Sequence, residues 1–414
     1  MFKPFVINSN IVTSQADVET FEAFMNATAR NIGNSYITYS LLKELGLPLS
    51  ALEGHEIKSV YTYNFAHDSQ KDIDTINNEC THILLMLQDQ IRIQESYGFR
   101  LPFKQLTDFL KQTKCPIIIA GLGANSFDGY KSDFYTMLDE EQVTFWRYIS
   151  TRCAVIGLRG SFTEEVLHNI GVDNTQVIGC PTYYERGANR KIEKRKWHDN
   201  MKLSCSSGFS TKLTNAVVYL QDMQEEERIR QIAYHADGIV KPTLYDAIIN
   251  KRFRIFSSMS SWRNDLADKD FFWGYRMHGA MVALNSEVPV VVLNRDSRSR
   301  EMCEFMNIPY YPGYIIDSME DVEKLYQMCD YARMNTEYHG KLSDYEAFLN
   351  KNGLNYAPLQ DSIHKIDLAL YSDLHVRKVN IFEDIVYGIS KNMMPKSLNK
   401  KLRALYTKIV KRNK

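Results

Sequence analysis

Short segments made almost wholly of apolar residues recur along this chain, and they constrain its fold more than any other feature. The clearest are 116–120 (PIIIA) and 288–293 (VPVVVL), and stretches with a helical apolar period alternate with segments of this kind. Strands as apolar as these are typical of parallel sheets that helices cover on both faces. The pattern therefore predicts an α/β fold.

The same criteria place the remaining strands and the first helices. The predicted strands are 82–87, 115–120, 154–158 and 176–178 in the first half of the chain, and 216–220, 254–257 and 288–293 in the second. Short helices are predicted at 163–169, which Gly171 ends, and at 279–285, which ends before Pro289. From about Leu342 the apolar pattern is helical again, and we expect these C-terminal helices to pack back across the fold.

The length of 414 residues is about twice that of an ordinary domain, so two domains are expected. A polar, charged segment at 185–198 (ERGANRKIEKRKWH) has no apolar period, and a second series of strands and helices begins after it. We therefore predict two Rossmann-like domains facing a cleft, as in GT-B-like folds, with C-terminal helices. The predicted boundaries are 1–190, 191–385, and a separate tail at 386–414.

Charge is concentrated in that tail, because residues 391–414 contain nine Lys or Arg and no acid. Two interpretations stay open: a basic amphipathic helix lying on an anionic membrane surface, or a terminal helix docked on the protein. The seven cysteines form no C-x-x-C pair, and no apolar run approaches the length of a membrane span. We expect a cytoplasmic protein, at most peripheral on the inner face of the plasma membrane, without a metal and without a nucleic-acid partner.

Three helix starts carry the polar residues best suited to chemistry. Arg276 and His278 follow an aromatic strand in FFWGYRMHG, Arg159 follows the strand 154–158 in GLRGS, and a glycine turn at 31–35 (NIGNS) opens a helix. Free N–H groups at a helix start favour phosphate or carboxylate, and ligands of α/β sheets bind at the carboxyl ends of strands. Arg can hold a carboxylate with two hydrogen bonds, and His exchanges protons near neutral pH.

In this order and spacing, over about residues 30–315, these segments resemble the polysaccharide pyruvyltransferase family. Arg276-Met277-His278 matches the R-x-H of that family, Arg159 matches its mid-chain arginine, and Arg298 matches its later basic residue. Two positions depart from the pattern: Gly179-Cys180-Pro181 replaces an Asp-Pro of many relatives, and Arg298 replaces the lysine of some. Arginine binds phosphate but cannot become neutral, so it cannot act as an acid or base.

The resemblance implies transfer of the enolpyruvyl-derived group of phosphoenolpyruvate, with no nucleotide cofactor and with release of phosphate. Two hydroxyls of one sugar in a surface or capsular polysaccharide precursor, free or linked to a polyprenyl lipid, would form a cyclic ketal. Domain 1–190 would face the acceptor and 191–385 the donor. His278 is the expected catalyst, as acid or base. The expected substrate-binding residues are Arg159, Arg276, Arg298, Asn34, Gly121 and Gly123.

Other interpretations stay open from the residues alone. Arg276 could form a structural ion pair, and His278 could be a satisfied structural histidine. Gly121 and Gly123 lie in GLGANS, which lacks the third glycine of a dinucleotide fingerprint and is better explained as a tight turn whose amides line the cleft. Cys180 is predicted to be a buried thiol, since the sequence places no His or Asn beside it. A glycosyltransferase using a sugar nucleotide and a non-catalytic membrane-surface scaffold are the rival functions.

Overall fold

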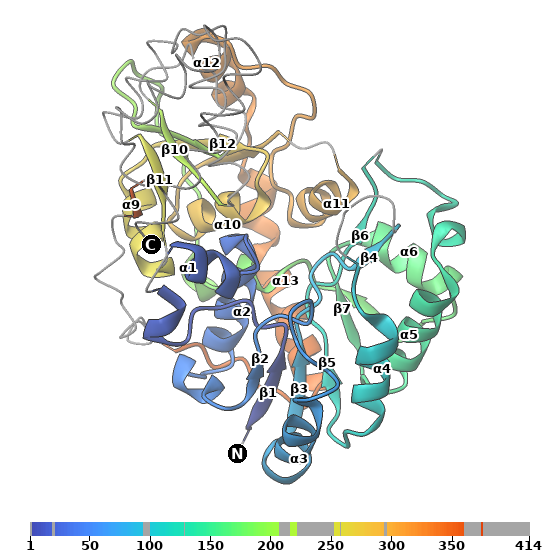
Figure 1. Cartoon of the computed structure of the whole chain (residues 1–414). Coiled ribbons are helices and arrows are strands. Elements are labelled where there is room, and N and C mark those ends of the chain that lie inside the picture. The colour runs from blue at the N-terminus through green and yellow to red at the C-terminus, as the bar shows by residue number, and fades with distance from the viewer. Residues whose placement is uncertain are drawn as a thin grey trace, which may run out of the picture.

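Two sheets, one from each half of the chain, form the framework of the protein (Figure 1). The computed structural model describes residues 2–18, 21–93, 100–127, 129–206, 216–221, 252–256, 258–293, 296–359 and 374–375. The predicted tail at 386–414 lies outside the described residues. Within the described part, no helix is long and apolar enough to span a membrane.

The first sheet is parallel throughout. Its strands run in the order β2 (Glu56–Ile57), β1 (Pro4–Ile7), β3 (His82–Leu85) and β5 (Ile117–Ile118). Hydrogen bonds from Gly157 N to Ile119 O and from Gly121 N to Gly157 O, both 2.9 Å, continue it to β7 (Ile156–Leu158) and β8 (Thr175–Val177). A short parallel ladder of β4 (Ile91–Arg92) and β6 (Ala124–Asn125) lies beyond its carboxyl edge.

Both faces of this sheet are buried, which explains why its strands are apolar without alternation. On β1, Phe5 and Ile7 pack into one hydrophobic cluster and Val6 packs into the other. The described part of the N-terminal half contains six α-helices. They are α1 (Phe21–Ala27), α2 (Ile32–Glu44), α3 (Ser69–Glu79), α4 (Phe103–Lys111), α5 (Glu140–Ser150) and α6 (Ser161–Asn169), with 3₁₀ turns at Gln15–Val18, Leu49–Leu52, Phe134–Met137, Pro181–Tyr183 and Gly187–Asn189.

The second sheet is parallel except at one edge. Its order is β13 (Val290–Val292), β12 (Phe271–Gly274), β9 (Leu203–Ser206), β10 (Val217–Tyr219), β11 (Phe253–Ile255) and β14 (Leu374–His375), with β14 antiparallel. Its helices are α9 (Met259–Ala267), α10 (Met277–Asn285), α11 (Ser297–Met306), α12 (Met319–Met328) and α13 (Ala332–Lys351). The predicted α/β class with two Rossmann-like parallel sheets is confirmed.

Two helices join the halves. The hydrophobic cluster that holds the second sheet also contains α2, and Ile32 N donates to Gln221 O at the end of β10. In the opposite direction α13 returns to the first sheet, as the expected C-terminal helices do: Tyr345 Oη donates to Glu44 Oε2 at 2.6 Å. Figure 1 shows α13 in the centre of the molecule, where the two halves meet.

Each predicted strand is present where the chain is described, but strands β1, β2, β4, β6, β9 and β14 were not predicted. Strand β9 has the sequence LSCS, and all four residues are buried. Because two of them are serines, the strand does not show the apolar run by which the other strands were predicted. Ser204 satisfies its hydroxyl by donating to Phe271 O at 2.9 Å, so a polar residue is tolerated inside the sheet. The segment 185–198 is irregular apart from one 3₁₀ turn, as expected. The domain limits at 190 and 385 stay predictions.

Candidate active site

His278 lies at the point where three segments from different parts of the chain meet. It is the second residue of α10, and Arg276 is the N-cap of that helix. The glycine turn of α2 packs directly on the imidazole: a Cβ atom added to Gly33 would lie 2.9 Å from His278 Nδ1. On the other side, Cys180 Sγ lies 4.0 Å from His278 Nε2. The ring is therefore fixed from both sides.

Arg159 follows β7 directly, and its side chain is turned inward. The residue is 3% exposed, and its Nε and Nη2 atoms are buried without a hydrogen-bond partner within the described part of the chain. Space for the side chain comes from Gly123, where an added Cβ would lie 2.8 Å from Arg159 Cδ. A buried guanidinium with unused donors is prepared to bind an anion.

The expectation that the amides of Gly121 and Gly123 face a ligand is wrong. Gly121 N donates to Gly157 O at 2.9 Å and Gly123 N donates to Gln88 O at 2.7 Å, so both N–H groups are used within the framework. Gly121 has a φ of +79°, which favours glycine at that turn. The two residues shape the turn and make room for Arg159; any role in substrate binding stays a prediction.

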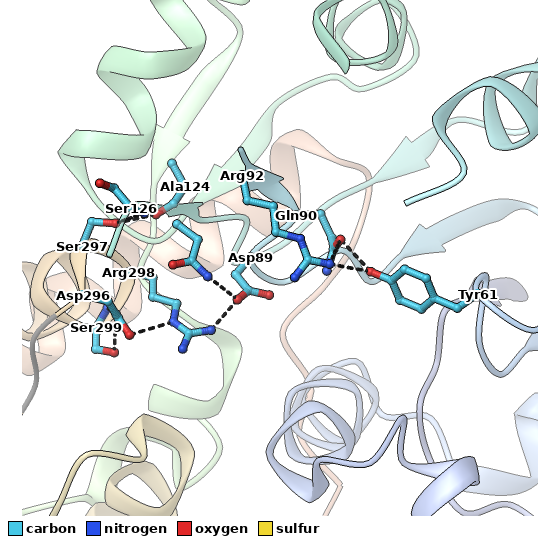
Figure 2. Close-up of polar contacts among 11 residues, drawn as sticks. Tyr61, Asp89, Gln90, Arg92, Ala124, Ser126, Asp296, Ser297, Arg298 and Ser299 are labelled. Carbon is cyan, nitrogen blue, oxygen red and sulfur yellow. Dashed lines mark hydrogen bonds and ion pairs between the residues drawn. The ribbon is translucent and has the colours of Figure 1, made fainter. Parts of the chain in front are cut away.

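Arg298 approaches the same region from α11 and contacts two carboxylates (Figure 2). Its Nη1 forms an ion pair with Asp89, and its Nε donates to Asp296 Oδ2 at 3.1 Å. Asn125 Nδ2 also donates to Asp89 Oδ2, at 3.0 Å. Asp89 belongs to the N-terminal half and Arg298 to the C-terminal half, so this ion pair crosses between them.

Helix α11 is held against the N-terminal half by side chains near its start. Ser297 Oγ donates to Ala124 O at 2.9 Å and accepts from Ser126 N at 2.8 Å. Glu301, which is 1% exposed, accepts from Thr163 N at 3.0 Å and so caps the first turn of α6. Burial raises the pKa of Glu301 to about 8, against the lowering effect of its hydrogen bonds to Thr163.

The cations act together on His278. Desolvation, followed by the charges of Arg159 and Arg298 and, more weakly, Arg276, lowers the pKa of His278 to about 3, while Asp89 opposes the shift. The imidazole is therefore neutral at pH 7 in the empty site, and an anion bound beside it would raise this pKa again and make it a stronger base. The three arginines named from the sequence thus all lie within electrostatic reach of His278.

Cys180 corrects one expectation. The thiol is fully buried as predicted, but a histidine does lie beside it, because α10 brings His278 within 4.0 Å. Burial raises the pKa of Cys180, although Arg159 and a hydrogen bond from Thr182 Oγ1 at 3.1 Å act in the opposite direction. A neutral thiol beside a neutral imidazole lacks the thiolate that nucleophilic catalysis requires.

Asn34 is the remaining predicted residue. It lies in the first turn of α2, next to Gly33, and its backbone N–H donates to Asn31 O at 3.0 Å. Asp89, in contrast, was not predicted. The signal was present, since QDQ at 88–90 follows the predicted strand 82–87 and the carboxyl ends of parallel strands are where ligands bind. Within the described residues, no group of three His, Cys, Asp or Glu side chains could hold a metal ion.

Two largely parallel sheets, with the buried Arg159 and the half-buried Arg276 and Arg298 near one imidazole, define an α/β protein with a site that can bind a small anion. A model of the polysaccharide pyruvyl transferase family matches residues 31–297, more than half of the chain, including Arg159 and His278 and ending directly before Arg298. The chain therefore belongs to the polysaccharide pyruvyl transferase family and is a transferase.

Comparison with solved structures gives only distant likenesses. One is a putative UDP-N-acetylglucosamine 2-epimerase from Listeria monocytogenes, with 12% identity, coverage of 90% of this chain and 96% of that chain, and a TM-score of 0.36. Another is the UDP-GlcNAc 2-epimerase of Methanocaldococcus jannaschii in complex with UDP-GlcNAc and UDP, with 9% identity, coverage of 83% and 100%, and a TM-score of 0.40. Such likenesses carry no argument about ligand or activity. No curated protein matches the chain at a significant level.

Proposed function

We propose that this transferase moves the enolpyruvyl-derived group of phosphoenolpyruvate onto two hydroxyls of one sugar in a polysaccharide precursor, forming a cyclic ketal. The observation that carries the proposal is Arg159, whose buried guanidinium has two nitrogens without a hydrogen-bond partner among the described residues and lies close enough to His278 to lower the pKa of the imidazole. An anion bound there would satisfy those donors beside a group that can move a proton.

The charge of the donor matches the charges around the imidazole. Phosphoenolpyruvate carries about three negative charges near pH 7, two on phosphate and one on carboxylate. Arg159, Arg276 and Arg298 carry one positive charge each, and an arginine holds carboxylate or phosphate through paired hydrogen bonds. The start of α10 adds the positive end of a helix dipole at His278. A donor with two anionic groups fits this arrangement.

Proton transfer assigns a role to His278. The neutral imidazole would accept the proton of the first sugar hydroxyl as that oxygen bonds to C2 of the donor, and would pass a proton to the C3 methylene, which becomes a methyl group. The second hydroxyl would then displace phosphate from C2, and its proton would leave with the phosphate. Atoms and charges balance without a cofactor. A proton transfer of this kind is worth about 10²–10⁴ in rate.

The test incubates purified protein with phosphoenolpyruvate and a synthetic glycan acceptor, measuring released phosphate and the acceptor mass. The expected product is heavier by one pyruvate less one water. His278→Gln should lose phosphate release while the donor still raises the melting temperature. A parallel incubation with sugar nucleotides separates the rival glycosyltransferase: nucleotide release there, with no phosphate released from phosphoenolpyruvate, would contradict the proposal.

A further inference from the structure

Asp89 places a negative charge inside a site that otherwise gathers positive ones. It follows β3 at the carboxyl edge of the first sheet, and its side chain is 17% exposed. Arg298 Nη1 and Asn125 Nδ2 both bond to its Oδ2 atom. Figure 2 shows the carboxylate between the guanidinium groups of Arg298 and Arg92.

The carboxylate remains ionised at any working pH. Burial alone would raise its pKa, but the charges of Arg298, Arg159 and Arg92 outweigh burial and lower the pKa of Asp89 to about 2. Asp89 thus interacts with two of the arginines proposed to hold the donor, Arg159 and Arg298. It also acts on His278, whose pKa it tends to raise.

We propose that Asp89 is an internal counter-ion that competes with phosphate for these guanidinium groups and thereby sets how readily the phosphate product leaves. The inference rests on the proposed function, because it concerns the leaving group of that reaction.

The charge balance gives the reason. Arg159, Arg276 and Arg298 contribute three positive charges and Asp89 removes one, while the charges of Arg92 and Asp296 cancel each other, so two remain. The donor has about three negative charges, more than the two positive charges that remain, whereas inorganic phosphate has about two and only equals them. Without Asp89 the three cations would hold the product more strongly. Because Arg298 already pairs with Asp89 in the empty site, the guanidinium of Arg298 keeps a counter-charge when phosphate leaves.

The test measures binding of inorganic phosphate by titration calorimetry to the full-length protein and to Asp89→Asn. Removing one negative charge beside the guanidinium groups that would hold phosphate should lower the phosphate dissociation constant by about tenfold. In turnover assays the same variant should show stronger product inhibition by phosphate and a lower kcat, with the donor KM lowered as well. Asp89→Glu, which keeps the charge, should bind phosphate as the wild type does.

Asp270→Asn is the matched control. Asp270 is 10% exposed and ion-paired to Arg195, so the substitution removes the same charge. It directly precedes β12, at the opposite edge of the second sheet from Arg276 and His278, and phosphate affinity should not change. If the Asp89→Asn protein does not fold, Asp89→Ser removes the same charge with a smaller side chain.

The outcomes separate this inference from the proposed function. Unchanged or weaker phosphate binding by the neutral variants, in a wild type that does release phosphate from the donor, would show that Asp89 only braces Arg298 and would overturn the inference alone. A wild type that binds neither phosphate nor phosphoenolpyruvate would overturn both.

Discussion

Replacing Arg159 by methionine should make the empty protein more stable while abolishing its activity. Within the part of the chain that the structure describes, the guanidinium has two buried nitrogens without hydrogen-bond partners, so the ligand-free fold carries a cost that a bound anion would remove. Methionine has an unbranched side chain of similar reach and carries no polar hydrogen, so it keeps much of the packing of the arginine stem.

The magnitude follows from the two unsatisfied groups. Each buried donor without a partner costs about 1–3 kcal/mol, and the lost attraction between Arg159 and Asp89 offsets part of the gain. A net increase of about 1–2 kcal/mol in the free energy of unfolding is expected, or about 1–2 °C in melting temperature for a chain of this length. Loss of a charge-assisted grip on the donor should lower kcat/KM by about 100-fold or more.

Thermal unfolding with and without phosphoenolpyruvate tests both parts. The donor at about 100 times its dissociation constant should stabilise the wild type by about 2.7 kcal/mol and leave Arg159→Met unchanged. Arg152→Met is the control, since the Arg152 guanidinium already donates to Leu110 O at 2.8 Å and Cys115 O at 2.6 Å. That variant should lose about 1–3 kcal/mol and retain activity. A destabilised Arg159→Met that still responds to the donor would refute the reasoning.

Four further outcomes are expected. Gly33→Ala would place a Cβ 2.9 Å from His278 Nδ1, so steady-state kinetics should show kcat lowered by about tenfold or more, with donor KM changed less; an unchanged kcat would mean the ring need not be held there. Gly157→Ala would bring a Cβ within 2.8 Å of Phe348 Cζ on α13. Urea unfolding should show a free energy of unfolding lower by about 1–3 kcal/mol, and an unchanged value would mean that α13 can shift at little cost. The pKa of His278 is about 3 in the folded protein and near 6.5 in the unfolded chain, so its contribution to stability is complete above pH 6.5 and is lost as pH falls toward 3. Denaturation at several pH values should therefore show that His278→Gln loses less free energy of unfolding on acidification than the wild type does. The same dependence of stability on pH in both proteins would contradict the shift. Glu301, with a pKa of about 8, contributes stability that is complete below pH 4.5 and is lost as pH rises through 8. Glu301→Gln should therefore lose less free energy of unfolding than the wild type as pH rises toward 8. An equal loss in both proteins would refute the raised pKa.

The sequence predicted those parts of the site that depend on local structure. Arg159 and Arg276 each stand between a strand and a helix, and the apolar run, the glycine and the helical period that mark such a junction lie within about ten residues of one another. The resemblance to the family, in turn, pointed to His278 and Arg298 as further residues of the expected site. The α/β class followed from strands buried on both faces.

The rest depends on contacts between distant segments. No local signal places Cys180 beside His278, because the 3₁₀ turn Pro181–Tyr183, which follows Cys180, meets α10 only through tertiary packing. Asp89 lies 209 residues before Arg298, and their ion pair requires α11 to dock on the N-terminal half. Strand β9 was missed because small polar residues can occupy a sheet interior when their hydroxyls find backbone acceptors, which a hydrophobicity pattern does not register.

The ion pair between Asp89 and Arg298 also has a consequence for exchanging parts between relatives. Because we expect residues 1–190 to face the acceptor, swapping that half would be a way to change acceptor preference, but the swap would place a new residue opposite an unchanged Arg298. A neutral residue at position 89 would leave Arg298 with the carboxylate of Asp296 alone, and a lysine there would repel it. A chimeric protein that joins halves of two relatives should therefore take residues 89 and 298 from the same relative.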